Sequence, residues 1–104
     1  MLKFYGSHLC KDCVNLKLNC EKYGIEYEYS DISNELAALK EFLKLRDENP
    51  VFEEARNAGG IGIPAIVNTD GTVTLDWMQV IRETGNEPFE EVKNRCSLTD
   101  RSGC

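Results

Sequence analysis

The chain has 104 residues and a formal net charge of −6, because 18 acidic residues outnumber 12 basic ones. This length predicts a single domain, and the acidic balance argues against nucleic acids and anionic membrane surfaces as partners, since both require a basic face. The N-terminus carries no signal-peptide pattern, and the longest uncharged stretch, residues 57–69, is too short to span a bilayer, so we expect a cytoplasmic protein.

Strand-like and helix-like patterns alternate in the first half of the chain. Residues 2–5 are predicted to form a strand, and residues 11–23 a helix that ends at Gly24, a residue suited to the left-handed turn after a helix. Over residues 25–29, aromatic or apolar residues alternate with acidic ones, which predicts a strand with one solvent-exposed face. Apolar residues spaced three and four apart over residues 35–45 predict a second helix.

The middle of the chain contains three more predicted elements. Asn49 and Pro50 suit the N-cap and the first helical position of a short helix, which ends at residues 59–60. Strand-like sequence returns over residues 61–67. An Asp-Gly turn then joins this strand to a second one over residues 72–75, which predicts a β-hairpin.

The end of the chain is predicted to be a helix followed by a tail. The helical spacing of Phe89, Val92 and Cys96 predicts a last amphipathic helix. The element order predicts an α/β domain over residues 1–96, with the first two strands parallel and the last two antiparallel. Residues 97–104 are predicted to form a flexible C-terminal tail.

Two cysteines stand where the first strand leads into the first helix. We expect Cys10 at or near the N-cap, exposed to solvent, with its sulfur facing unpaired backbone N–H groups and the positive helix end. These surroundings favour the thiolate; the charge of Lys11 acts in the same direction, and that of Asp12 opposes it. Cys13 lies one turn further on and is predicted to face the core. This pattern predicts Cys10 as the attacking nucleophile and Cys13 as the resolving thiol.

An Ile-Pro pair stands in the third predicted strand. Pro64 lacks a backbone N–H, which a strand tolerates at its first residue. The bond between Ile63 and Pro64 can be cis or trans, and the sequence leaves both isomers open. A cis bond would expose the backbone N–H and C=O of Ile63 as an edge for an extended substrate.

Four motifs follow one another along the chain in this order: Phe4-Tyr5, Cys10-Lys11-Asp12-Cys13, Tyr23-Gly24-Ile25 and Gly62-Ile63-Pro64-Ala65-Ile66-Val67. In this order they resemble glutaredoxin-like members of the thioredoxin superfamily, over residues 1–95. The resemblance implies a thioredoxin-like, glutaredoxin-type fold, with a four-stranded mixed sheet flanked by helices. It also implies thiol–disulfide oxidoreductase activity in which Cys10 attacks a disulfide, Pro64 is cis and Ile63 pairs with the substrate backbone.

The resemblance also implies partners and further binding residues. The substrate would be a protein disulfide or glutathione disulfide, and the reductant glutathione or another dithiol. Asp76 could match the aspartate that follows the last strand in these proteins, and Lys11 is a second candidate for substrate binding. Ser7 and His8 stand where glutaredoxins usually carry a lysine for glutathione. The expected chemistry needs no organic cofactor and no metal.

Two other functions stay open at this point. A Cys-x-x-Cys pair supplies two of the four ligands of a zinc site, and His8 with Cys96 or Cys104 could complete the set. An iron–sulfur cluster bridged between two chains is a variant of this metal hypothesis. The other alternative is a redox-sensing module that forms its disulfide once, without turnover.

The remaining cysteines and the single histidine have simpler interpretations. Cys20 is predicted to be a small buried hydrophobic residue, and Cys96 to be a core residue of the last helix. Cys104 is predicted to be exposed, either as an incidental thiol or as a third thiol that relays a disulfide. His8 is predicted to be a solvated loop residue, with proton transfer to the thiol that leaves Cys10 as the alternative.

Overall fold

A four-stranded mixed sheet is the centre of the structure, a computed structural model in which residues 1–92 are described. Its strands are β1 (Leu2–Gly6), β2 (Tyr27–Asp31), β3 (Ala65–Val67) and β4 (Val73–Thr74). The strand order is β2-β1-β3-β4: β1 and β2 pair in parallel, and antiparallel pairing joins β1 to β3 and β3 to β4. The predicted α/β class with a four-stranded mixed sheet is therefore confirmed.

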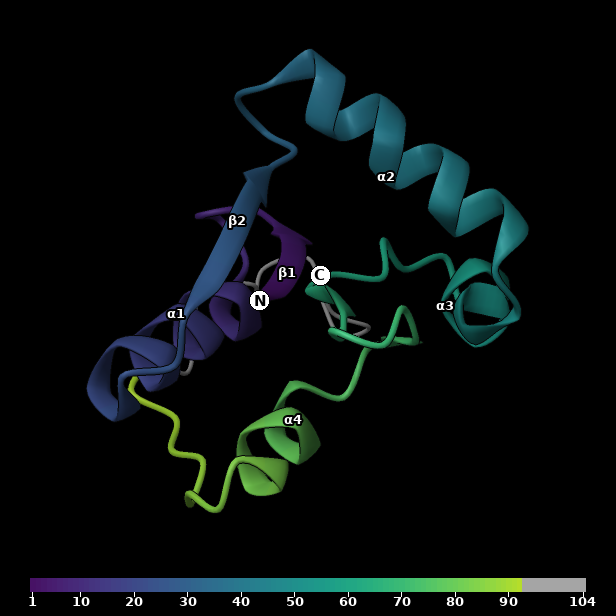
Figure 1. The fold of residues 1–104 in the computed structure, drawn as a ribbon. Helices are drawn as coiled ribbons and strands as arrows, with labels where there is room; N and C mark the ends of the chain where they lie inside the picture. The colour runs from purple at the N-terminus through teal and green to yellow at the C-terminus, as the bar shows by residue number, and fades with distance from the viewer. Residues whose placement is uncertain (93–104) are drawn as a thin grey trace.

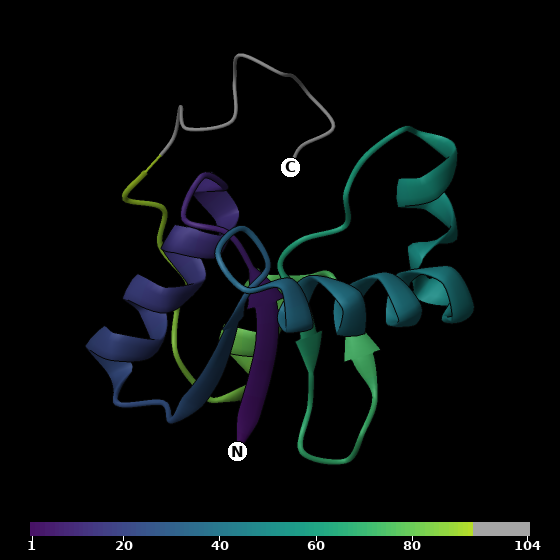
Figure 2. The same ribbon diagram turned by 90° about the horizontal axis from the view of Figure 1, so that it is seen from above.

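Helices cover both faces of this sheet (Figures 1 and 2). One face carries α1 (Lys11–Tyr23) and α4 (Trp77–Glu83). The other face carries α2 (Leu36–Glu48), which is followed by the 3₁₀ helix η1 (Pro50–Phe52) and the short helix α3 (Glu53–Asn57). This arrangement is compatible with the thioredoxin-like fold.

Each face of the sheet has its own core, because successive side chains of a strand point to opposite faces. On β1, Phe4 packs on the side of α1 and α4, and Tyr5 packs on the side of α2; on β3, Ile66 and Ala65 divide in the same way. The "α2 cluster" consists of Tyr5, Cys10, Cys13, Phe42, Phe52, Ile63 and Ala65, and the "α4 cluster" of Phe4, Leu16, Cys20, Ile66, Trp77, Val80 and Ile81.

The β1–α1–β2 unit closely follows the prediction. Helix α1 ends at Gly24, whose φ of 67° is left-handed and whose N–H donates to the carbonyl of Cys20. The N–H of Ile25 donates to the same carbonyl at 2.9 Å, so this residue still belongs to the helix end. For this reason β2 begins only at Tyr27, two residues later than predicted, where the parallel register pairs it with Leu2.

The predicted last helix is wrong in the part that the structure describes, because residues 86–92 have no helical conformation. A helix that was not predicted, α4, lies earlier in the chain. The carboxylate of Asp76 caps it by accepting a hydrogen bond from the N–H of Gln79 at 3.1 Å. Its buried residues Trp77, Val80 and Ile81 have helical spacing, the signal that the sequence analysis overlooked. The predicted tail, residues 97–104, lies outside the described residues.

The elements between β2 and β4 are of the predicted types, but their boundaries differ from the predicted ones. The side chain of Asn49 caps η1 by accepting a hydrogen bond from the N–H of Val51, as predicted. In α2 the apolar stripe is only partly buried: Phe42 is 1% exposed, but Leu36 is 67% exposed. Strand β3 begins at Ala65, because the segment before it runs past Phe52 without pairing in the sheet.

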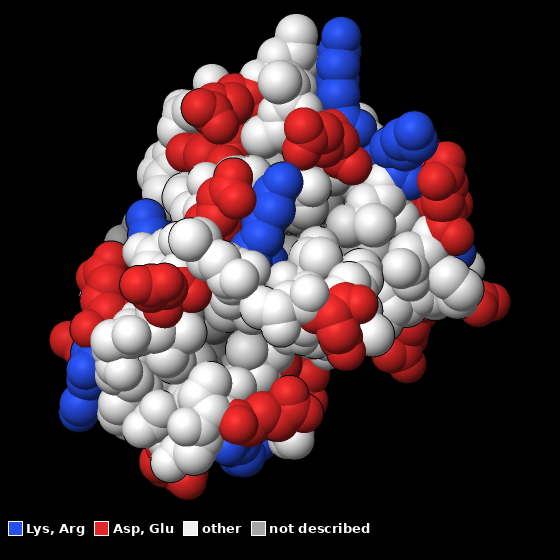
Figure 3. Space-filling model, in the orientation of Figure 1, with Lys and Arg blue, Asp and Glu red and all other residues white. Residues whose placement is uncertain are grey.

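Acidic and basic side chains are interspersed on the face shown in Figure 3. A hollow of about 630 Å³ lies at the start of β1, lined in part by Leu2, Asp70 and Val80. This hollow is at the opposite end of β1 from Cys10, which comes four residues after the last residue of that strand. Within residues 1–92, no helix is both long enough and apolar enough to cross a bilayer.

Candidate active site

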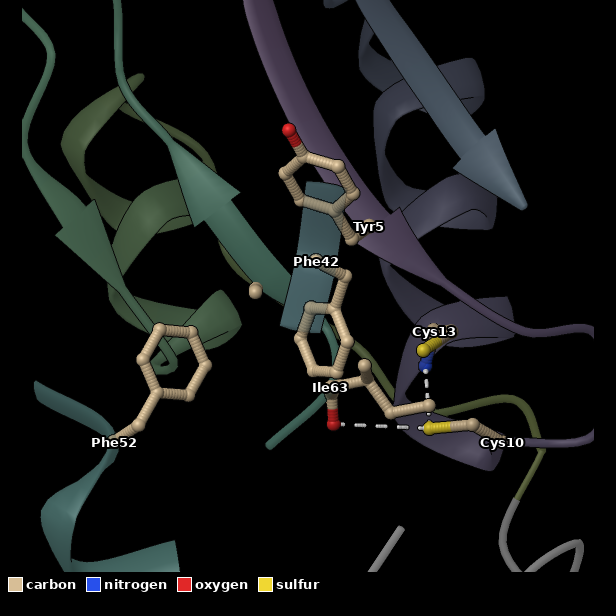
Figure 4. Packing of buried hydrophobic residues seen from close by; sticks show 7 residues of the cluster. Tyr5, Cys10, Cys13, Phe42, Phe52 and Ile63 are labelled. Atoms are coloured by element: carbon tan, nitrogen blue, oxygen red, sulfur yellow. Dashed lines mark hydrogen bonds between the residues drawn. The ribbon is translucent and has the colours of Figure 1, made fainter. Parts of the chain in front are cut away.

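The sulfur of Cys10 caps the N-terminus of α1. The backbone of Cys10 is extended (φ −100°, ψ 123°), and its Sγ accepts a hydrogen bond from the N–H of Cys13 at 3.3 Å (Figure 4). A serine, threonine or aspartate oxygen usually has this role at a helix start. The predicted N-cap position is confirmed, and it places the sulfur at the positive end of the helix.

Hydrogen bonds to its sulfur lower the pKa of Cys10. The largest contribution comes from the thiol of Cys13, which donates to the Cys10 sulfur, and the backbone N–H groups of Cys13 and Asp12 add to it. Burial and the negative charge of Asp12 act in the opposite direction without outweighing these donors. Burial raises the pKa of Cys13, and its bond to Cys10 raises that pKa further. Cys10 is therefore the thiol that ionises first, and Cys13 stays protonated as its donor.

Cys13 packs against Gly6, a residue of β1 that has no side chain. A Cβ atom on Gly6 would lie 2.8 Å from the sulfur of Cys13, which is too close for two non-bonded atoms. The backbone N–H of Ser7 donates to the same sulfur. Cys13 is 1% exposed, so the prediction that it faces the core is confirmed.

The predicted exposure of Cys10 is wrong, because this residue is also only 1% exposed. Its N–H donates to the carbonyl of Ser7 at 3.1 Å, and this turn folds it back onto the α2 cluster next to Ile63. The N-cap position determines where the sulfur lies relative to the helix. It does not determine which other segments pack over the sulfur, and that was not visible in the sequence.

The segment before β3 forms the second side of the site. The peptide bond between Ile63 and Pro64 is cis. The carbonyl oxygen of Ile63 lies 3.9 Å from the Cys10 sulfur, within reach of a weak bond from its thiol (Figure 4). Gly62, with a φ of +93°, allows the chain to pass Phe52, because a Cβ there would lie 2.8 Å from a carbon of the Phe52 ring. The structure thus brings together Cys10, Ile63 and Pro64.

A polar network holds the loop between β1 and α1. The hydroxyl of Ser7 accepts a hydrogen bond from the N–H of Leu9 and donates to the hydroxyl of Ser33, which in turn donates to Asp31 at 2.7 Å. The ring nitrogen Nδ1 of His8 lies 3.4 Å from the same Ser33 hydroxyl. This contact connects the His8 ring to the loop at the end of β2.

The two further binding candidates have structural contacts of their own. The ammonium group of Lys11 forms an ion pair with the carboxylate of Asp12 at 2.9 Å, and this hydrogen bond is the main reason that the pKa of Lys11 is raised. Asp76 caps α4, so its carboxylate has a role in the fold whether or not it also meets a substrate. Lys11 adjoins the thiol pair in the chain, between Cys10 and Asp12.

The other cysteines differ from the pair at the helix start. Cys20 is fully buried in the α4 cluster, as predicted, and burial raises its pKa to about 11. Cys96 and Cys104 lie outside the described residues. Within residues 1–92, no group of three or more His, Cys, Asp or Glu side chains is placed to hold a metal ion. The four-ligand sets suggested above include Cys96 or Cys104, so the structure does not test them.

Two buried asparagines of α1, which the sequence analysis did not single out, bind a segment after α4. We call this segment, residues 87–92, the strap. Asn15 accepts hydrogen bonds from the N–H groups of Glu91 and Val92 and donates to the carbonyl of Val92 at 2.7 Å. Asn19 exchanges two hydrogen bonds with the backbone of Phe89. Asparagine is disfavoured in helix interiors. A pair of asparagines four residues apart within a helix was therefore the signal in the sequence for this role.

Comparisons with known proteins give this chain a family but no activity. The chain is 33% identical over 73 residues to an uncharacterized protein of Haemophilus influenzae, a match that covers 70% of this chain and 84% of the relative. The chain belongs to the family of that protein. No family profile matches it, and no solved structure matches it. The geometry of the site is therefore the basis on which a function for this chain can be proposed.

Proposed function

We propose that this protein is a thiol–disulfide oxidoreductase with Cys10 as its nucleophile. The observation that carries the proposal is the position of one sulfur: Cys10 Sγ caps α1, receives hydrogen bonds from Cys13 and lies beside the carbonyl of Ile63. Low-pKa thiols at helix N-termini are the reactive form of cysteine in proteins. The resemblance to glutaredoxin-like proteins agrees with this chemistry.

The proposed reaction has two exchange steps. The Cys10 thiolate attacks one sulfur of a substrate disulfide, and the other sulfur leaves as a thiolate that takes a proton from solvent. Cys13 then attacks the Cys10 sulfur, the second substrate thiol leaves, and a Cys10–Cys13 disulfide remains. The backbone of Ile63 borders the Cys10 sulfur, where it can pair with the substrate chain. An external dithiol or glutathione returns the protein to its reduced form.

Access to Cys10 is part of this proposal. Because Cys10 is 1% exposed, a substrate disulfide contacts its sulfur only after the chain around it moves. The dithiol reductants of this chemistry are maintained in a reducing compartment such as the cytoplasm, where disulfide substrates are transient, and we place the protein there.

The burial of Cys10 also favours a second candidate function, a redox-sensing module. A sensor needs its thiol pair to be oxidised once and to change what the protein contacts, and it does not need rapid access for successive substrates. The two candidates share the nucleophile and differ in turnover.

Turnover of a small disulfide tests the proposal. The full chain, 2-hydroxyethyl disulfide and excess dithiothreitol are combined, and release of 2-mercaptoethanol is followed against the reaction without protein. We expect many turnovers for each protein molecule, loss of this activity in Cys10→Ser, and no loss in Cys20→Ala, whose thiol lies in the other cluster. One equivalent of reaction followed by a stop would favour the sensor, and no reaction at all would contradict both candidates.

A further inference from the structure

The strap brings an acidic side chain to the start of α1. As the strap advances along the chain, its partners on the helix move toward the helix N-terminus, and in this order they are Tyr23, Asn19 and Asn15. The strap is therefore antiparallel to α1 and runs toward the end that carries Cys10. Glu90 stands between the strap residues that Asn19 and Asn15 bind, so its backbone is held from both sides.

The side chain of Glu90 is exposed and acts on Lys11, the residue that follows Cys10. Lys11 precedes Asn15 by four residues, about one turn of α1. Its hydrogen bond to Asp12 is the largest cause of its raised pKa, and the negative charge of Glu90 adds to it. The ammonium group is also 2.9 Å from the carboxylate of Asp12. Two carboxylates thus surround one ammonium group, which leaves one negative charge in excess beside the thiol pair.

Two more charged residues are joined to the loop before Cys10. The carboxylate of Asp31 accepts a hydrogen bond from the hydroxyl of Ser33 at 2.7 Å, and the ring of His8 lies 3.4 Å from the same hydroxyl. Asp31 and His8 therefore act on each other across one hydroxyl group, and a protonated His8 offsets the charge of Asp31. The excess carboxylate is the one that the strap supplies.

We propose that Glu90 makes the site selective for disulfides that carry positive charge. This inference rests on the proposed thiol–disulfide exchange and adds the substrate class: a disulfide flanked by ammonium or guanidinium groups reacts faster than an anionic disulfide of the same size. The exchange itself is unchanged. The Cys10 thiolate forms a bond to one substrate sulfur, the substrate S–S bond breaks, and the other sulfur leaves as a thiolate that takes a proton from solvent.

The charge of the strap can act while Cys10 is still covered. Electrostatic interactions extend over about 8 Å at physiological ionic strength, so a carboxylate at the edge of the site concentrates cations there before the chain over the sulfur moves. A cleft lined by one sign of charge raises association rates by about 10- to 1,000-fold, and one excess carboxylate should act at or below the lower end of this range. Glutathione carries two carboxylates and one ammonium group, so the same charge disfavours it.

Three small disulfides of different charge test the selectivity. Cystamine carries two ammonium groups, 2-hydroxyethyl disulfide is neutral, and 3,3′-dithiodipropionate carries two carboxylates. Each is added to full-length Cys13→Ser at an ionic strength of about 0.1 M, where the screening length is about 10 Å. Mass spectrometry of the peptide that contains Cys10 gives the initial rate of adduct formation. Division by the rate of the same disulfide with 2-mercaptoethanol removes its intrinsic reactivity.

The normalised rate should be about fivefold higher for cystamine than for 3,3′-dithiodipropionate, with 2-hydroxyethyl disulfide between them. An ionic strength of about 1 M should bring this ratio close to one, because the screening length falls to about 3 Å. A ratio is the suitable measure, since a change in the pKa of Cys10 affects its reaction with all three disulfides equally and cancels.

Two matched substitutions within the strap isolate Glu90. Glu90→Gln should lower the ratio about threefold, because it removes a charge that attracts one probe and repels the other. Glu87→Gln removes the same charge from the same strap, but the backbone of Glu87 is bound by Tyr23, twelve helix residues or about 18 Å from Lys11. This control should leave the ratio unchanged, whereas Lys11→Gln should raise it about threefold.

The outcomes distinguish this inference from the proposed function. If 2-hydroxyethyl disulfide forms an adduct with Cys10 but the three normalised rates are equal, or the anionic disulfide is the fastest, the selectivity is contradicted and the proposed function stands. If Glu87→Gln lowers the ratio as much as Glu90→Gln does, the role of Glu90 is contradicted, because the net charge of the protein is then the cause. If none of the three disulfides forms an adduct with Cys10, the proposed function fails, and this inference fails with it.

Discussion

The α2 cluster and the α4 cluster lie on opposite faces of the sheet, and each contains a buried cysteine from the region of α1. The pKa values of these two cysteines are shifted in opposite directions. Cys10 in the α2 cluster and Cys20 in the α4 cluster are 1% and 0% exposed. Burial raises the pKa of Cys20 to about 11, whereas donors from Cys13 and the helix start lower the pKa of Cys10. The difference teaches that hydrogen-bond donors, and not exposure, separate a thiol with a lowered pKa from one with a raised pKa in this protein.

The largest expected effects come from removing a ring or an aliphatic side chain from one cluster at a time. Phe52→Ala should lower the free energy of unfolding by about 3–5 kcal/mol and Ile81→Ala by about 2–5 kcal/mol. Because Phe52 packs against Phe42 and supports the segment at Gly62, its loss should accelerate alkylation of Cys10 more than that of Cys20. Ile81→Ala should do the reverse. Urea unfolding and timed alkylation with peptide mapping measure both.

An equal acceleration at both cysteines in both variants would contradict this prediction. It would mean that alkylation proceeds through global unfolding, and that the two clusters do not open separately.

A smaller effect is expected from removing the donor thiol. Cys13→Ala should raise the pKa of Cys10, because the Cys13 thiol is the largest of the contributions that lower it. Alkylation of Cys10 follows the thiolate fraction, so its rate should increase with pH and level off at lower pH in the wild type than in Cys13→Ala. The rate at Cys20 should still be increasing near pH 11 in both proteins.

Cys20→Ala is the matched control, since it removes a buried thiol of the other cluster. It should leave the pH profile of Cys10 unchanged, and an equal shift of that profile in both variants would argue against the Cys13 donor.

The smallest effects are expected from neutralising the carboxylate beside each thiol. Asp12→Asn should lower the pKa of Cys10, and Glu21→Gln should lower that of Cys20, because each charge disfavours the neighbouring thiolate. Each change should alter the free energy of unfolding by only about 0–1 kcal/mol, as is usual for exposed charges. After Glu21→Gln the pKa of Cys20 should remain above its ordinary value, since burial is the larger cause. The pH dependence of alkylation at each cysteine is the measurement.

A shift of the Cys10 profile in Glu21→Gln, or of the Cys20 profile in Asp12→Asn, would show that the charges do not act locally.

Most of the fold could be predicted because its signals are local. The stop of α1 at Gly24, the cap of η1 by Asn49 and the β-hairpin each depend on a few adjacent residues. The helix predicted around Phe89 failed because two buried asparagines bind the backbone of this segment in a non-helical form, through contacts between residues 70 or more apart. Helix α4 was missed although its cap Asp76 and apolar spacing are local signals.

The candidate site likewise has features that follow from local sequence signals and features that depend on long-range contacts. The N-cap position of Cys10 and the inward direction of Cys13 follow from their spacing at a helix start, and both were predicted. The burial of Cys10 depends on the segment at Ile63, more than 50 residues away, and could not be read from that spacing. The role of Asn15 is likewise a long-range contact, since its partners are Glu91 and Val92.

The binding of the strap by Asn15 and Asn19, through Phe89, Glu91 and Val92, has a practical consequence for shortened versions of this protein. A chain cut before Glu87 would leave both amide side chains, which are 0% exposed in the full chain, without the backbone groups that they bind. Each unsatisfied buried amide costs about 1–3 kcal/mol. A domain boundary drawn at the end of α4 would therefore remove part of the folded unit, and fragments for crystallisation or fusion should extend at least through Val92.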